Sequence, residues 1–176
     1  MSTTTSAGTK TQLVFRVYIK ASRQAVWDAI TKREWTERYG YGGGPEEELS
    51  KTGPYRILTS KEMKSAGAQH GFTVPEVAID GEVLEIDPPH KLVTTWRMLM
   101  DDNLAAEGFT QLTYELDERP GGITRLTVVH ELENAPQLAL LLAGEAEDSG
   151  AGGGWYWVLS SLKTLLETGT SLVHGA

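Results

Sequence analysis

The feature that most limits the possible folds is a change of hydrophobic period near residue 155. Before this point, several stretches alternate apolar and polar side chains, with the period of two that is typical of strands with one buried face. After it, apolar side chains recur at helical spacing, at Trp155, Leu159, Leu162 and Leu166. Such a chain can bury one face of a sheet and one stripe of a long helix by packing them together.

These patterns predict two main helices and six strands. A strand over residues 13–19 leads to Ser22, whose side chain can cap a helix from about Arg23 to Thr31. The terminal helix is predicted from Gly154 to Thr168, because Gly169 supplies a C-terminal stop. The remaining segments are a short helical turn over 34–39, an exposed turn region over 61–71, and strands over 55–60, 76–86, 90–98, 109–116 and 124–132. Consecutive strands most simply form an antiparallel meander.

The length of the chain fits one domain, since 176 residues can bury a core without disulfide or metal support. No internal repeat or linker is visible, so we expect one domain over residues 13–169, with tails at 1–12 and 170–176. The first tail is rich in Ser and Thr and lacks the apolar segment of a signal peptide. We therefore expect a cytoplasmic protein.

Charge and missing residue types argue against several classes of function. A formal net charge of −8 repels phosphate backbones, so we expect no nucleic acid partner. No apolar run approaches the roughly 20 residues that span a bilayer, and we expect no membrane insertion. The chain has no cysteine, its histidines lack ligand spacing, and the glycines at 42–44 and 152–154 do not match a phosphate-binding loop. We predict no metal and no other cofactor.

Three segments resemble those of a known fold superfamily. They are VYIKAS at 17–22 with AVW at 25–27, the stretch from Gly81 to Pro88 with LVTTW at 92–96, and Gly154-Trp155 leading into 159–167. They are similar to the START-like, or SRPBCC, superfamily, and within it to the Hsp90 ATPase activator homologue 1-like branch. The resemblance covers roughly residues 13–169. It implies an α+β helix-grip fold, in which a curved antiparallel sheet of about six strands wraps around a long C-terminal helix and encloses a cavity.

Strand alternation then indicates which side chains face that cavity. On each strand, side chains two residues apart share a face, and the faces toward the terminal helix are mostly apolar or aromatic. We predict seven ligand-binding residues: Trp96, Met98, Tyr114, Val128, His130, Trp155 and Leu159. The aromatic members combine apolar faces with polar edges, as ligand pockets do. The alternative for the same residues is a filled core.

Two polar side chains on these strands each allow two interpretations. His130 could contact a ligand or act as a base near neutral pH, or it could be a hydrogen-bonded core residue. Arg97 falls on the strand face opposite Trp96, which favours an outward position over a clamp for a ligand carboxylate.

Several functions stay open at this point. The preferred one is a non-catalytic protein that carries or sequesters an apolar or aromatic metabolite, because no convergent acid–base pair is evident. The first alternative is an enzyme of the polyketide cyclase type, with His130 and Tyr114 as candidates for proton transfer. The resemblance also implies two other possibilities: natural-product self-resistance of the calicheamicin kind, in which a glycine is sacrificed to an enediyne radical, and a co-chaperone role. The sequence does not predict the oligomeric state.

Overall fold

A computed structural model describes residues 11–173 of the chain. Its elements are β1 (Gln12–Ile19), α1 (Arg23–Thr31), α2 (Arg33–Thr36), β2 (Gly44–Pro45), β3 (Ile57–Leu58), α3 (Lys61–Gln69), β4 (Val77–Asp80), β5 (Val83–Asp87), β6 (Lys91–Met98), α4 (Asp102–Ala106), β7 (Thr110–Arg119), β8 (Ile123–Glu131), α5 (Pro136–Leu142), the 3-10 turn η1 (Glu147–Ser149) and α6 (Gly154–Thr168).

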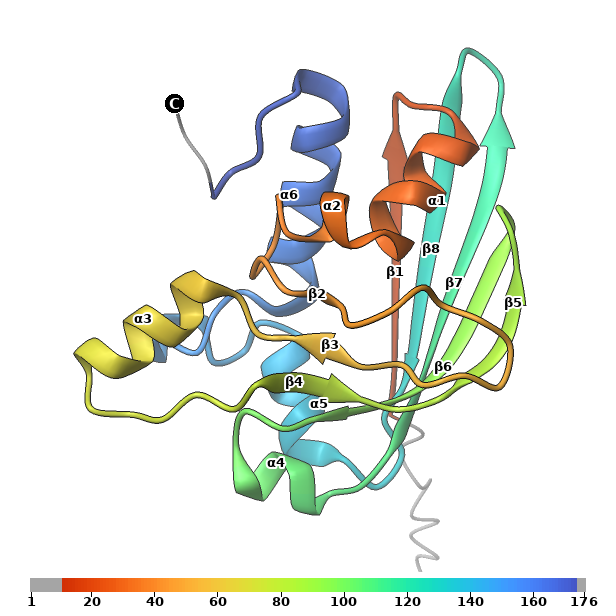
Figure 1. Cartoon of the computed structure of the whole chain (residues 1–176). Helices are drawn as coiled ribbons and strands as arrows, with labels where there is room; N and C mark the ends of the chain where they lie inside the picture. The colour runs from red at the N-terminus through yellow and green to blue at the C-terminus, as the bar shows by residue number, and fades with distance from the viewer. Residues whose placement is uncertain (1–10, 174–176) are drawn as a thin grey trace, which may run out of the picture.

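The strands form one antiparallel sheet in the spatial order β1-β8-β7-β6-β4-β3-β2, with β5 also paired to β6. Strands β5 to β8 form the predicted meander, and β1 closes it by pairing with β8 along its whole length. Helix α6 lies beside β1, with α1 and α2 close to it (Figure 1). The predicted helix-grip fold is confirmed, with eight strands rather than about six.

Helix α6 has the predicted bounds, Gly154–Thr168. It buries its apolar stripe against the sheet, including Trp155, Leu159 and Leu162. At its start, Gly154 has a φ of 63° and sits so close to the Leu142 carbonyl that a Cβ would collide with it. Only glycine allows this approach, so the first turn of α6 packs directly against the end of α5.

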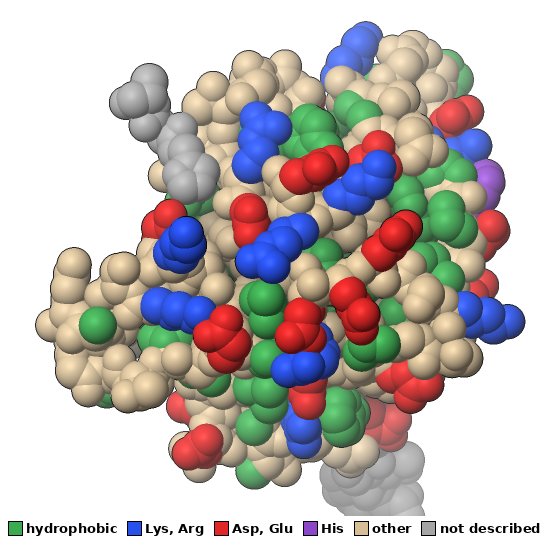
Figure 2. Space-filling model, viewed as in Figure 1, with side chains coloured by type: hydrophobic (Ala, Val, Ile, Leu, Met, Phe, Trp, Pro, Cys, Tyr) green, Lys and Arg blue, Asp and Glu red, His purple; other side chains and the backbone are tan. Residues whose placement is uncertain are grey.

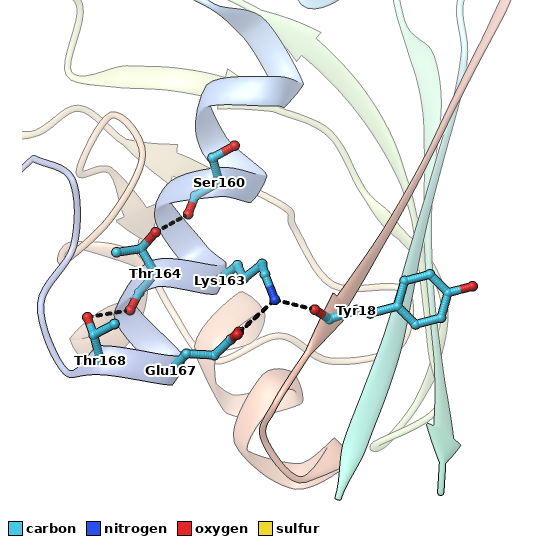
Figure 3. A network of polar contacts seen from close by, with 6 residues as sticks. All are labelled: Tyr18, Ser160, Lys163, Thr164, Glu167 and Thr168. Atoms are coloured by element: carbon cyan, nitrogen blue, oxygen red, sulfur yellow. Dashed lines mark hydrogen bonds and ion pairs between the residues drawn. The ribbon is translucent and has the colours of Figure 1, made fainter. Parts of the chain in front are cut away.

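The outer side of α6 satisfies its polar groups locally and is tied to the edge strand β1 (Figure 3). Lys163 Nζ pairs with the Glu167 carboxylate at 2.6 Å and donates to the backbone oxygen of Tyr18 at 2.6 Å. The hydroxyls of Thr164 and Thr168 each donate to the carbonyl four residues earlier. These contacts leave the opposite side of the helix free to be apolar.

The segment over residues 61–71 is where the predicted secondary structure is wrong. It contains a helix, α3, rather than an exposed turn region. The Ser60 side chain caps this helix by accepting from the Met63 backbone N–H at 3.1 Å. No residue of α3 is buried, and its one large apolar side chain is Met63, so the sequence gives little hydrophobic signal by which the helix could be recognised.

The predicted strand over residues 76–86 is divided into β4 and β5 at Gly81. The Gly81 backbone passes so close to the Thr95 carbonyl that a Cβ would collide with it. The next N–H, of Glu82, donates to the Thr95 hydroxyl at 2.8 Å. Both short strands still pair with β6, and a glycine in a strand interior commonly marks such a break.

Arg97 on β6 has the outward position that the sequence favoured. Its Nε and Nη2 donate to the Asp80 carboxylate at 3.0 and 2.6 Å, and its guanidinium lies 4.3 Å from the centre of the Phe109 ring. Such pairs are common on this surface, and Figure 2 shows acidic and basic side chains interspersed over the face in view. Opposite charges thus screen one another locally across the surface.

Of the predicted tails, 1–12 and 170–176, residues 1–10 and 174–176 lie outside the described residues. Within the described part, Gln12 is already the first residue of β1, and Ser171 is buried. The division of the chain at residues 13 and 169 stays a prediction. No helix among residues 11–173 is long and apolar enough to cross a membrane.

Candidate functional site

A cavity of about 470 Å³ lies between the start of α6, the strands β6 and β7, and two loops. The loops are residues 39–43, after α2, and residues 55–58, around β3. This volume falls within the roughly 300–1,000 Å³ that is usual for sites of small organic molecules. We call it the inner cavity.

Three large aromatic side chains form one wall of the inner cavity. Trp96 comes from β6, Tyr114 from β7 and Trp155 from the first turn of α6, and each is less than one-tenth exposed. The rings of Tyr114 and Trp155 meet edge to face, with centroids 6.0 Å apart. Because such packing fixes ring positions, this wall presents a rigid, mostly apolar surface to the inner cavity.

His130 stands behind this wall in a fully buried hydrogen-bond chain. Its Nδ1 accepts from Trp155 Nε1 at 3.2 Å, and its Nε2 lies 2.8 Å from the hydroxyl oxygen of Thr110. An indole N–H can only donate, so the neutral imidazole carries its proton on Nε2 and donates it to Thr110. The Thr110 hydroxyl then donates to the Trp96 carbonyl at 2.9 Å. Burial lowers the pKa of His130 from 6.5 to about 3.

The polar groups of the inner cavity are mainly tyrosine hydroxyls. Tyr39, Tyr55 and Tyr114 line it and are buried, and burial raises the pKa of each above its usual value. The Tyr39 hydroxyl donates to the Ala29 carbonyl at 2.9 Å. The hydroxyls of Tyr55 and Tyr114 interact with each other, which lowers the pKa of Tyr55 and raises that of Tyr114 beside the larger effect of burial. All three are therefore neutral near pH 7, and they act as hydrogen-bond donors or acceptors rather than as charges.

A second cavity of about 460 Å³, the outer pocket, adjoins the inner cavity and shares the wall residues 39–42 and Met63. Tyr41 lies in this shared wall and is 45% exposed. Burial raises the pKa of its hydroxyl, and the nearby backbone N–H groups of Gly153 and Gly154 at the start of α6 offset part of this rise. A Cβ on Gly152 would approach this hydroxyl to 2.5 Å, so glycine at that position leaves room for the contact.

Four of the seven predicted ligand-binding residues line the inner cavity: Trp96, Met98, Tyr114 and Trp155. The other three, Val128, His130 and Leu159, point inward as expected but are buried in the packed core and do not line it. The alternation of a strand identifies the inward face, but it does not distinguish a hollow part of the interior from a filled one. The ligand-binding role of all seven stays a prediction.

The strand pattern missed the cavity residues that lie outside the strands. Tyr39, Tyr41, Tyr55 and Met63 all line a cavity, and none lies on a strand. One signal was available, since Tyr39 and Tyr41 flank a glycine immediately before the glycines at 42–44. Aromatic side chains beside flexible backbone are typical of loops that cover ligand sites.

Among residues 11–173, no group of three or more His, Asp or Glu side chains is placed to hold a metal ion. The hydrogen-bonding groups described above can orient a ligand and can donate to a carbonyl or ether oxygen. They provide no buried pair of acid and base at the cavity surface, since the buried imidazole lies behind it.

The curved antiparallel sheet and the long terminal helix define a protein of the helix-grip, START-like class. Residues 20–167 match the family described as Activator of Hsp90 ATPase homolog 1-like protein, and the chain belongs to that family. No curated protein sequence matches the chain.

Solved structures with the same fold have low sequence identity to the chain. DynU16, from the dynemicin biosynthetic locus, is 18% identical with a TM-score of 0.59, and the match covers 92% of this chain but only 49% of that one. CalU16 of Micromonospora echinospora is 16% identical with a TM-score of 0.58, covering 92% and 78%. MLL2253 of Mesorhizobium loti is 18% identical with a TM-score of 0.61, covering 88% and 96%. The chain thus spans about half the length of DynU16 and nearly all of MLL2253.

Proposed function

We propose that the chain is a non-catalytic binding protein that holds one small apolar or aromatic molecule in the inner cavity, as a carrier or to sequester it. The observation that supports this most is the inner cavity itself, about 470 Å³ in volume and walled by Trp96, Tyr114 and Trp155. A cavity with aromatic walls and few, well-placed polar groups is typical of small-molecule sites.

The geometry favours binding over polyketide cyclase chemistry. A general base must reach the proton that it removes, either directly or through one water. Both ring nitrogens of His130 are engaged, with Trp155 and Thr110, and the imidazole does not line the cavity. The other candidate, Tyr114, has its pKa raised further by burial and by its tyrosine neighbours, which makes it a poor base near pH 7.

The direct test is native mass spectrometry of the protein purified from its own source. A bound molecule that is lost on denaturation, at one per chain, is the expected result. A protein that carries no molecule, and that also fails to bind any apolar aromatic probe in solution, would overturn the proposal. The same experiment on the variant Met98→Trp, which adds bulk to the inner cavity, serves as the control for where the molecule sits.

Natural-product self-resistance is a second candidate, favoured by the glycines at positions 40, 42, 43 and 154, which line the inner cavity. The origin of DynU16 in the dynemicin biosynthetic locus supports a ligand of that kind. Exposure to an activated enediyne should then cut the chain beside one of these glycines, giving two defined fragments by intact mass. An unchanged mass would remove the sacrificial role and leave sequestration. The Hsp90 role in the family's description is not carried over to this chain, because fold alone does not set function, and a cytoplasmic location stays a prediction.

A further inference from the structure

We propose that the inner cavity and the outer pocket form one binding site that rejects anions. Its ligand is uncharged where it lies in the inner cavity, and it bears no carboxylate, phosphate or sulfate on the part that reaches the outer pocket. This inference rests on the proposed function and adds to it the chemical class of the ligand.

The inner cavity offers no positive charge to an anion. None of its lining residues is Lys, Arg or His. Arg97 lies on β6 between the cavity residues Trp96 and Met98. Its guanidinium points outward, however, and pairs with Asp80. An anion in this cavity would lose its hydration without gaining an ionic partner, which is strongly unfavourable.

The hydroxyl groups in the inner cavity are too few to replace that hydration. The Tyr39 hydroxyl already donates its hydrogen bond to the Ala29 carbonyl. The hydroxyls of Tyr55 and Tyr114 interact with each other, which occupies part of their donor capacity. The donors that remain, including the Tyr41 hydroxyl in the shared wall, are neutral and few, and they suit a neutral carbonyl, whereas a carboxylate has about four acceptor positions to satisfy.

The outer pocket and the end of the inner cavity carry negative charge. Glu62 and Glu147 line the outer pocket, and Asp101 lines the inner cavity, where its carboxylate accepts from the N–H groups that begin α4. No Lys, Arg or His among residues 11–173 lines either space. These carboxylates repel a ligand anion, and the net charge of −8 adds to the effect at longer range.

A matched pair of probes separates charge from shape. Methyl naphthoate and naphthoate share the same ring and carbonyl, and the ester has a neutral methoxy group where the carboxylate has a negatively charged oxygen. Their binding to the full chain near pH 7.5 can be followed by quenching of tryptophan fluorescence. We expect saturable binding of the ester and affinity for the carboxylate weaker by about tenfold or more. Equal affinity for the two probes would overturn the rejection of anions and leave the proposed function standing. Binding of neither probe, nor of other neutral aromatic molecules, would overturn the proposed function itself.

Two variants test whether anions bind weakly because the inner cavity has no positively charged side chain. Met98→Lys places a positive charge on the inner cavity, and it should raise the affinity for naphthoate relative to the ester by about tenfold. Arg97→Met removes the outward guanidinium and should leave that ratio unchanged. If Arg97→Met instead abolishes carboxylate binding, Arg97 serves the ligand and the inference is wrong. Should Met98→Lys be unstable, the partly exposed Met100→Lys adds the charge to the same cavity.

Discussion

Trp155 Nε1 donates a hydrogen bond to Nδ1 of His130, and this contact joins the first turn of α6 to β8 behind the cavity wall. It continues through Thr110 to the backbone of Trp96 on β6. Two aromatic residues of the inner cavity are therefore held by one buried polar chain. Such a chain stabilises a single arrangement of the wall when every member is satisfied.

The buried imidazole predicts a pH dependence of stability. Burial lowers the pKa of His130 from 6.5 to about 3, so between these values the unfolded chain binds a proton that the folded chain does not. The free energy of unfolding should therefore fall as the pH falls below 6.5, by about 1 kcal/mol from about pH 6 to about pH 5.

Urea unfolding at the two pH values measures this loss. The variant His130→Gln keeps an amide in place of the ring and has no proton to bind, so its loss over the same interval should be smaller by about 1 kcal/mol. The other histidines are the same in both proteins, so their contribution cancels in the comparison. Equal losses in the two proteins would mean that His130 is protonated in the folded state.

The hydroxyl pair of Tyr55 and Tyr114 predicts a preference for ligands with a hydrogen-bond acceptor. The double variant Tyr55→Phe/Tyr114→Phe should lower the affinity for methyl naphthoate about two- to tenfold, as expected for the loss of one neutral hydrogen bond. Affinity for ethylnaphthalene, which has no acceptor, should stay the same. An equal loss for both probes would indicate a change of cavity shape instead of a lost hydrogen bond.

Tyr41 predicts a kinetic effect, because its hydroxyl lies beside the backbone at the start of α6, between the two cavities. Tyr41→Phe removes this polar contact and should raise both the association and dissociation rates of a neutral probe about two- to tenfold, with little change in affinity. Stopped-flow fluorescence gives both rates. Tyr156→Phe is the matched control, since Tyr156 is 62% exposed and packs on Phe15 away from the cavities. Unchanged rates for Tyr41→Phe would show that the contact does not limit access.

The parts of the fold that the sequence predicted well are those with a strong local signal. Helix α1 has a Ser22 cap and α6 has an apolar stripe ending at Gly169, and both have the predicted bounds. Helix α3 has a cap at Ser60, but none of its residues is buried and Met63 is its one large apolar side chain, so its hydrophobic signal is weak. The break at Gly81 depends on the close approach of Thr95, a contact that no local pattern contains.

The candidate site was only partly predictable for a similar reason. The alternation of side chains along the strands correctly predicted that Trp96 and Tyr114 face the cavity. The same alternation also selected Val128, which lies in the filled core. Whether an inward side chain meets empty space depends on what the loops place opposite it. Here Tyr39 and Tyr55 come from loops whose path is set by tertiary contacts.

Because the inner cavity is hollow and the core is filled, a substitution to Trp should affect the free energy of unfolding differently at the two places. Met98 on β6 lines the cavity, and Met98→Trp should change the free energy of unfolding by less than about 1 kcal/mol because the indole enters empty space. Leu112 on β7 is fully buried in the core and does not line the cavity. Leu112→Trp should therefore cost about 1–3 kcal/mol or more by overpacking. Urea unfolding of both variants makes the comparison.

The most direct test of a ligand-binding cavity is calorimetric titration of the native chain and of Met98→Trp with methyl naphthoate. The native protein should bind one molecule per chain at about micromolar affinity, roughly −8 kcal/mol, and the folded variant should bind at least about tenfold more weakly. Absence of binding to the native chain, together with a strongly destabilised Met98→Trp variant, would contradict the account. That result would mean that the residues between the sheet and α6 form an ordinary filled core.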